Sequence, residues 1–262
     1  MKVLNGKPKI RLLQHYRNLW VFNFNRFRGD SYQLMREYFA AILISEVEEF
    51  MSLWNKRILD VGGARGEFCK VIYNERKGEV INLDRDSSQY VWQKTIIGCA
   101  EDIPSKDNAF DLVICRGVLE HIRQEKQQQS INELFRVTKI GGICYIMIPP
   151  WYNPHAGHEL KPFHVLPFYV AKYLRALIFR ERINAESFED INLFPITFKK
   201  MLKMVTISGF KVMATKDTHF RMHFLTKIPV IQEIAVPSVS FILKKEKRTP
   251  KLSHNLNFCL VF

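Results

Sequence analysis

The sequence is poor in cysteine and has no pattern that would tie its cysteines together. The 262 residues contain five cysteines, an odd number with no C-x-x-C pair, which excludes a disulfide framework and a cysteine-rich zinc site. Cys69, Cys115 and Cys144 stand in apolar stretches, so we expect buried, reduced thiols at these positions.

Long apolar runs are also absent. The longest uncharged stretch, 140–158, contains Gly-Gly and Pro-Pro, which would leave backbone groups unpaired in lipid, so it cannot form a spanning helix. The N-terminus is basic but has neither the apolar run nor the small-residue cleavage site of a secretory signal. We therefore expect a cytoplasmic protein.

Charge of one sign dominates only the two flanks of the chain. Apolar residues make up 47% and charged residues 25% of the sequence, as is typical of a soluble globular protein. The formal charge is +4 over residues 1–56, zero over 57–150 and +9 over 151–262. A basic flank can meet phosphates, an anionic membrane surface or an acidic substrate.

Residues 56–150 alternate between apolar strands and amphipathic helices. Before them, Asp30-Ser31 is a helix N-cap signal, and apolar residues then recur at helical spacing to about Trp54. The next stretch predicts strands at 57–61, 79–83, 110–115 and 142–148 and helices at 67–75 and 127–138, the latter stopped by Gly141-Gly142. Strands that are apolar throughout predict a parallel sheet covered on both faces.

After Pro150 the pattern changes and later resumes. Residues 151–195 are rich in aromatics and histidines, whereas 195–208 predicts a helix ended by Gly209, and 210–215 and 237–243 predict strands. We infer four parts from these changes: an N-terminal helical extension (1–55), a sheet domain (56–150 and 196–246), an inserted cap (151–195) and a tail (247–262).

One motif carries chemistry. Asp60-Val-Gly-Gly-Ala-Arg-Gly66 joins a predicted strand to a predicted helix through glycines, and this geometry suits a nucleotide-like ligand at the carboxyl ends of a parallel sheet. The spacing differs from the G-x-G-x-x-G of dinucleotide sites, and no Lys-Ser or Lys-Thr ends the loop as in a phosphate-binding loop. An acid before the glycines suits a cationic or polyhydroxyl ligand.

The motif resembles the first motif of class I S-adenosylmethionine-dependent methyltransferases. Four further segments are similar to family segments in the family's order: Asp84 at the end of the second strand, 100–104, 110–121 and 139–142. The resemblance implies a Rossmann-like, doubly wound α/β fold with a seven-stranded sheet, mostly parallel with an antiparallel last strand. N-terminal helices and a helical cap inserted after the fifth strand would complete it.

The resemblance also implies S-adenosylmethionine as the cofactor and assigns roles to residues. Asp84 would take the ribose hydroxyls, the segment around Glu101 would frame the adenine, and the glycines would give room. The implied cofactor-binding set is Asp60, Gly62, Gly63, Gly66, Asp84, Arg85, Glu101, Asp102, Ile103 and Arg116. No metal is expected, because the sulfonium already activates the methyl group and the protein supplies positioning and, for a hydroxyl acceptor, a general base.

Two residues depart from the family's pattern. Ala64 replaces the usual second glycine, and its methyl group can be tolerated if the position keeps a negative φ. Cys99 stands where an acid is common, so adenine recognition would rest on Glu101, Asp102 or backbone groups.

The acceptor region is expected at 151–182. His155, His158 and His164 match no common zinc spacing, so we interpret them as base, substrate contact or loop structure, and we take His121, His155 and His158 as the catalytic candidates. The motifs of adenine amino-group and cytosine C5 methyltransferases are absent, which disfavours base methylation by these routes.

Two segments are each compatible with more than one kind of binding partner. Residues 167–182 predict a broadly apolar helix with a basic stripe of Lys172, Arg175 and Arg182, which suits a lid, a dimer contact or a helix at an anionic membrane surface. Residues 1–29 carry seven basic groups and no acid among aromatics, which suits packing, nucleic acid or a membrane.

We therefore expect methyl transfer by in-line displacement to a hydroxyl or similar nucleophile of a small, sugar- or lipid-linked acceptor. The protein would be cytoplasmic and could sit peripherally on a membrane. The alternatives are an RNA methyltransferase, for which the basic flanks would track phosphates, and a non-catalytic cofactor-binding or scaffold protein, motivated by Ala64 and Cys99.

Overall fold

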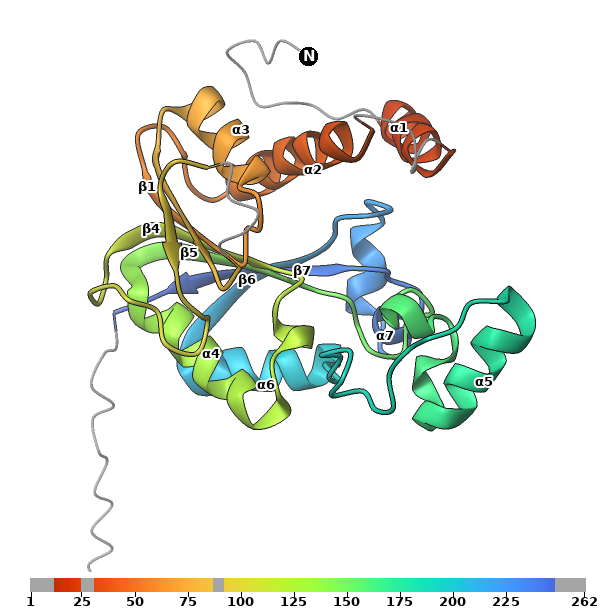
Figure 1. Ribbon diagram of the computed structural model, residues 1–262. Coiled ribbons are helices and arrows are strands. Elements are labelled where there is room, and N and C mark those ends of the chain that lie inside the picture. The colour runs from red at the N-terminus through yellow and green to blue at the C-terminus, as the bar shows by residue number, and fades with distance from the viewer. Residues whose placement is uncertain (1–11, 25–30, 87–91, 248–262) are drawn as a thin grey trace, which may run out of the picture.

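A seven-stranded mixed sheet forms the centre of the molecule (Figure 1). The computed structural model describes residues 12–24, 31–86 and 92–247. The strand order is β3-β2-β1-β4-β5-β7-β6, and β7 runs antiparallel to both of its neighbours. The strands are β1 (Arg57–Val61), β2 (Glu79–Asp84), β3 (Thr95–Ile97), β4 (Phe110–Arg116), β5 (Thr138–Ile148), β6 (Phe210–Asp217) and β7 (Val239–Lys245). The doubly wound fold with an antiparallel last strand is thus confirmed.

Helices cover both faces of the sheet. The α-helices are α1 (Leu12–Phe24), α2 (Ser31–Val47), α3 (Glu67–Arg76), α4 (Gln124–Val137), α5 (Phe168–Phe179), α6 (Phe198–Ser208) and α7 (Ile231–Ile234). Helices α2 and α3 lie on one face, and α4 and α6 lie on the other (Figure 1). Each face therefore has its own buried apolar core, as the apolar character of the strands requires.

Two predicted boundaries before the cap are wrong, and one strand was missed. The helix expected to reach Trp54 ends at Val47, because the chain turns there and Glu48 pairs with Arg76 at 2.7 Å. The turn expected at Gly141-Gly142 lies within β5, as an irregularity in its pairing with β4. The edge strand β3 was not predicted, since three residues are too few to show a period. The N-cap at Asp30 and the tail from 248 lie outside the described residues.

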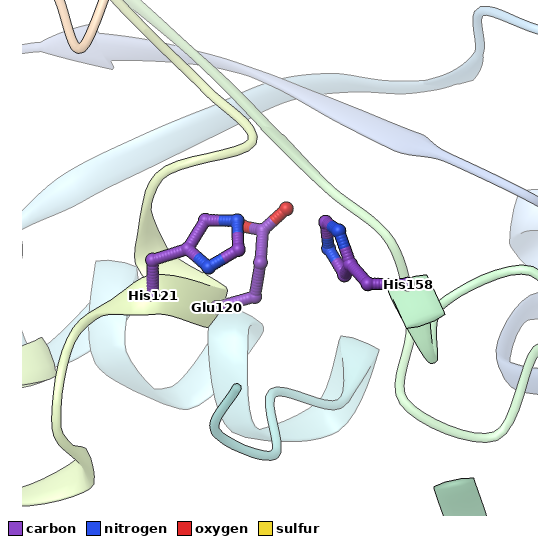
Figure 2. A group of neighbouring side chains, drawn as sticks. All are labelled: Glu120, His121 and His158. Atoms are coloured by element: carbon purple, nitrogen blue, oxygen red, sulfur yellow. The ribbon is translucent and has the colours of Figure 1, made fainter. Parts of the chain in front are cut away.

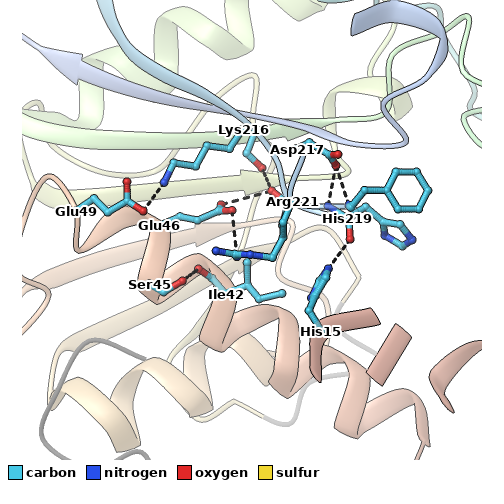
Figure 3. A network of polar contacts seen from close by, with 12 residues as sticks. His15, Ile42, Ser45, Glu46, Glu49, Lys216, Asp217, His219 and Arg221 are labelled. Atoms are coloured by element: carbon cyan, nitrogen blue, oxygen red, sulfur yellow. Dashed lines mark hydrogen bonds and ion pairs between the residues drawn. The ribbon is translucent and has the colours of Figure 1, made fainter. Parts of the chain in front are cut away.

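A polar network joins the N-terminal helices to the turn after β6 (Figure 3). His15 on α1 lies 2.6 Å from the backbone oxygen of His219, and Lys216 pairs with Glu49 at 2.6 Å. The carboxylate of Glu46, which is fully buried, accepts a hydrogen bond from the hydroxyl of Tyr145 at 2.8 Å. These contacts fix α1 and α2 against the sheet through buried polar groups.

The cap (151–195) has a small core of its own. It contains the 3-10 turns η3 (His158–Leu160) and η4 (Phe163–Val165) and the helix α5, which ends three residues before the predicted Arg182. Leu160, Phe168, Ala171 and Ile183 are buried against one another. The α5 helix is therefore packed as one unit with the turn that carries His158.

The basic stripe predicted on the cap helix is not formed, because two of its three side chains bind groups within the cap. Arg175 is buried and pairs with Glu181, and Lys172 donates to the backbone oxygen of Ala185 at 2.6 Å. Lys172 and Arg175 bind acceptors inside the cap that periodicity does not reveal, whereas Arg182 lies beyond the end of the helix and is exposed. Within the described parts of the chain, none of the helices has both the length and the apolar character needed to span a bilayer.

Candidate functional site

A pocket of about 200 Å³ opens where the strand order reverses between β1 and β4. Such a switch point at the carboxyl ends of parallel strands is the usual ligand site of open α/β sheets. Five of the predicted site residues line it: Gly62, Asp84, Arg85, Glu101 and His121. Gly63 lies in the same loop as Gly62, and a Cβ atom there would lie 2.3 Å from Oδ1 of Asn82.

The glycine loop after β1 forms one wall of the pocket. Gly62 has a φ of +69°, and a Cβ atom there would lie 2.3 Å from Cγ2 of Val118, so only glycine fits this turn. Its N–H donates to the backbone oxygen of Leu83 at 2.7 Å, which holds the loop against β2. Gly66 lies at the start of α3 with a φ of +80° and completes the turn from strand to helix.

Ala64 does not keep the negative φ that would have accommodated its methyl group. Its φ is +50°, in the left-handed region that is costly for any residue with a Cβ. The loop compensates with hydrogen bonds. The N–H of Ala64 donates to Oδ2 of Asp84 at 2.7 Å, and its backbone oxygen accepts from Nδ2 of Asn82 at 3.0 Å. Asp84 therefore positions the glycine loop as well as lining the pocket.

Beneath the loop, charges of both signs are buried together. Burial raises the pKa of Asp60 to about 6, and Arg116 and Arg36 act in the opposite direction. Burial also lowers the pKa of Arg116 to about 10, which leaves the guanidinium charged at neutral pH. It stacks on the ring of Phe68 at 3.8 Å. Arg36 reaches the same ring from α2 at 5.1 Å.

The opposite wall comes from the segment after β3. Glu101 pairs with Arg85 at the pocket, and its other oxygen, Oε2, is buried without a hydrogen-bond partner. Asp102 is exposed and outside the lining. Ile103 is buried in the core, and its N–H donates to Glu133 at 2.9 Å. Of the expected adenine segment 100–104, Ala100 and Glu101 therefore line the pocket, together with the preceding Cys99.

Two of the three candidate histidines meet beside the pocket (Figure 2). The ring centroids of His121 and His158 lie 4.8 Å apart. Nδ1 of His121 lies 2.7 Å from the backbone oxygen of Asn192. A carbonyl only accepts, so Nδ1 carries a proton, and in the neutral imidazole Nε2 then keeps a lone pair. Burial lowers the pKa of His158 to about 4, so its imidazole is neutral at pH 7. His155 is exposed and takes no part in this group.

Sequence reasoning missed three residues of the site. Arg36 lies on α2, where helical periodicity gives no sign that it reaches Asp60. Phe68 supplies the ring on which Arg36 and Arg116 stack. Glu120, next to His121, lay in the segment that resembles the family's fourth strand and following turn and was given no role, yet its carboxyl group lies between the two histidines (Figure 2). The only signal for Glu120 in the sequence was its position next to His121, a catalytic candidate.

Comparisons with known proteins agree with this geometry. Residues 59–146 match a family model described as a methyltransferase domain. An uncharacterized methyltransferase of Mycobacterium leprae is 29% identical over 143 residues, which cover 54% of this chain. That match spans about half of the relative's length, 52%. A methyltransferase of Mycobacteroides abscessus is 23% identical over 209 residues, covering 75% of this chain and 79% of that protein.

A solved structure shares the fold at lower identity. A TehB-like methyltransferase from Corynebacterium glutamicum superposes with a TM-score of 0.55 over 88% of this chain and 96% of its own, at 14% identity. At this identity the likeness concerns the architecture. The chemistry has to be argued from the residues of the site.

Proposed function

We propose that this chain, whose central part is a class I S-adenosylmethionine-dependent methyltransferase domain, transfers a methyl group to a hydroxyl of a lipid- or sugar-linked acceptor. The observation that carries the proposal is the pocket at the sheet's switch point, with carboxylates at one end and a histidine with a free Nε2 at the other. S-adenosylmethionine supplies an activated methyl group when it is bound.

The charges around the pocket fit this cofactor. Asp84 and Glu101 offer carboxylate oxygens, one of them buried and unpaired, and such oxygens suit the hydroxyls and amino group of an adenosine. Asp60, Arg36 and Arg116 bring both signs of charge to the glycine loop, as a zwitterionic amino-acid moiety requires. The left-handed Ala64 does not block the loop, because its hydrogen bonds to Asp84 and Asn82 are formed.

The His121 side chain supports a hydroxyl acceptor. In-line displacement forms an oxygen–carbon bond and breaks the carbon–sulfur bond, and the hydroxyl proton must leave. In the neutral imidazole of His121, the tautomer that donates from Nδ1 to the Asn192 carbonyl has a lone pair on Nε2, and this lone pair can take the hydroxyl proton. The neutral imidazole of His158 beside it adds no positive charge that would oppose this transfer.

The cap supports an acceptor held at a lipid surface. Helix α5 lies at the periphery of the molecule (Figure 1). It exposes a broad apolar and aromatic face, which consists of Tyr169, Val170, Tyr173, Leu177 and Ile178. Exposed Arg180 and Arg182 follow it. Aromatic and apolar side chains beside arginines suit the interface of an anionic bilayer. Because α5 packs with the turn that carries His158, a membrane-bound cap would bring the acceptor to the site.

Transfer of a labelled methyl group tests the proposal. The purified chain is incubated with labelled S-adenosylmethionine and separate lipid, soluble glycan and RNA fractions. We expect label in the lipid fraction, and we expect a loss of about 10²–10⁴-fold in rate for His121→Ala, the usual contribution of a general base. Label in RNA alone would contradict the proposal, as would no transfer by protein that binds the cofactor.

Vesicle binding tests the membrane part separately. Leu177→Asp on α5 should weaken binding to vesicles that contain anionic lipid, because it places a charge in the apolar face. Ile207→Asp on α6 is the matched control, since the two side chains are similarly exposed at 62% and 59%. Equal binding by both variants would remove the membrane role of α5.

A further inference from the structure

Glu120, His121 and His158 form a group beside the pocket, at the end that His121 lines (Figure 2). One potential ligand atom of each, a carboxylate oxygen and two imidazole nitrogens, lies within 4.8 Å of the other two. Two of the residues come from the turn after β4, and the third comes from the cap, 37 residues further along the chain. This separation explains why no ligand spacing was visible in the sequence.

One oxygen of the Glu120 carboxyl group lacks a partner. Glu120 is 3% exposed, and its Oε2 is buried without a hydrogen-bond partner. No lysine or arginine among the described residues forms an ion pair with it. A buried polar group is costly unless it is hydrogen-bonded, and a buried charge unless it is paired or binds a metal. The group is therefore set up to meet a cation that the chain does not itself supply.

The two histidines present lone pairs to the same place. Nδ1 of His121 donates to the backbone oxygen of Asn192 at 2.7 Å, and a carbonyl that accepts from the far nitrogen in this way commonly orients a metal-bound imidazole. Nε2 of the neutral His121 imidazole then has the lone pair that can bind a cation. His158 lies on η3 with a φ of +47°, which turns its ring toward His121 at an interplanar angle of 67°.

We propose that Glu120, His121 and His158 bind one divalent first-row transition-metal cation beside the pocket. Two nitrogen donors and one carboxylate suit Zn²⁺, Fe²⁺, Co²⁺ or Mn²⁺ better than the oxygen-seeking Mg²⁺ or Ca²⁺. Atoms that bind one cation at about 2.1 Å lie at most about 4.2 Å apart. The widest pair, within 4.8 Å, therefore closes by at least about half an ångström on binding, and His158 on its short turn can supply this movement.

Three protein ligands leave positions open for water or a substrate oxygen. This consequence rests on the proposed function: an acceptor hydroxyl that binds the cation would have its pKa lowered by the metal charge. His121 would then serve as a ligand rather than as the base, and the hydroxyl proton would leave from the metal-bound oxygen to solvent. The site thus favours acceptors with an oxygen beside the one that is methylated, because both could reach a cation with open positions.

Titration of the chelator-treated full-length chain with Co²⁺ tests the site. We expect one cation per chain and a visible d–d absorption band, with the same stoichiometry for Zn²⁺ by calorimetry. Glu120→Gln and His158→Gln should each weaken binding by about tenfold or more. His155→Gln is the matched control, because this exposed histidine lies three residues away and outside the group.

Equal affinity for Co²⁺ in the wild-type chain and His158→Gln would overturn the site, as would the absence of binding. S-adenosylmethionine is titrated into the same samples to separate the two proposals. Cofactor binding without metal binding would refute the cation site and leave the proposed function intact. Metal binding without cofactor binding would support the cation site and contradict the proposed function.

Discussion

Replacing Asp60 by asparagine should stabilise the fold at neutral pH. Burial raises the pKa of Asp60 from 3.8 to about 6, about two units, and each unit corresponds to about 1.4 kcal/mol. Between about pH 4 and pH 6 the native state holds a proton that the unfolded state has lost. The free energy of unfolding contributed by this group therefore falls by about 3 kcal/mol as the pH rises through this window. Asparagine, which stays neutral, avoids this loss.

Urea unfolding at several pH values measures the effect. The stability difference between Asp60→Asn and the wild type should be small near pH 4 and should grow to about 3 kcal/mol in favour of the variant above pH 7. Asp102→Asn, at an exposed carboxylate, is the control and should show no such growth. A difference for Asp60→Asn that does not change with pH would refute the assigned burial of this carboxyl group.

Two further perturbations test the glycine loop and the polar network. Ala64→Gly should stabilise the chain by about 1 kcal/mol, because relief of the left-handed strain, about 1–2 kcal/mol, exceeds the entropy that glycine adds to the unfolded chain. A thermal melt should then shift upward by about 2–4 °C, and an unchanged or lower melting temperature would argue against the φ of +50°. Tyr145→Phe should cost about 1–3 kcal/mol, since it deprives the buried Glu46 of a donor. Urea unfolding checks this against Tyr152→Phe at an exposed site, and equal stability of the two variants would contradict it.

The sheet and the pocket were predictable because their signals are local. Continuous apolar strands that end in Asp60-Val-Gly-Gly and in Asp84 place both motifs at the carboxyl edge of a parallel sheet, and the structure places Gly62 and Asp84 together in one pocket. The capping Gly209, with a φ of +96°, was predictable for the same reason.

The remaining site residues lie in loops, which show no hydrophobic periodicity, or depend on contacts between distant segments. His155 and His158 are three residues apart, yet only His158 meets His121, because the intervening backbone turns at Gly157 rather than following a helix. Arg36 had no role in the sequence analysis and Arg175 was placed in a basic stripe, but tertiary contacts bring Arg36 near the buried Asp60 and Arg175 to the backbone oxygen of Lys161. Positions of this kind follow from packing between distant segments, which a single sequence does not encode in its spacing.

Calorimetric titration with S-adenosylmethionine and its product S-adenosylhomocysteine tests the central claim most directly. The wild-type chain should bind both, and Asp84→Asn should bind them about ten- to a hundredfold more weakly, because it removes a charged acceptor from the pocket. The control, Asp102→Asn, changes a carboxylate outside the lining and should bind like the wild type. A folded wild-type chain that binds neither ligand, or an Asp84→Asn variant that binds both unchanged, would contradict the account.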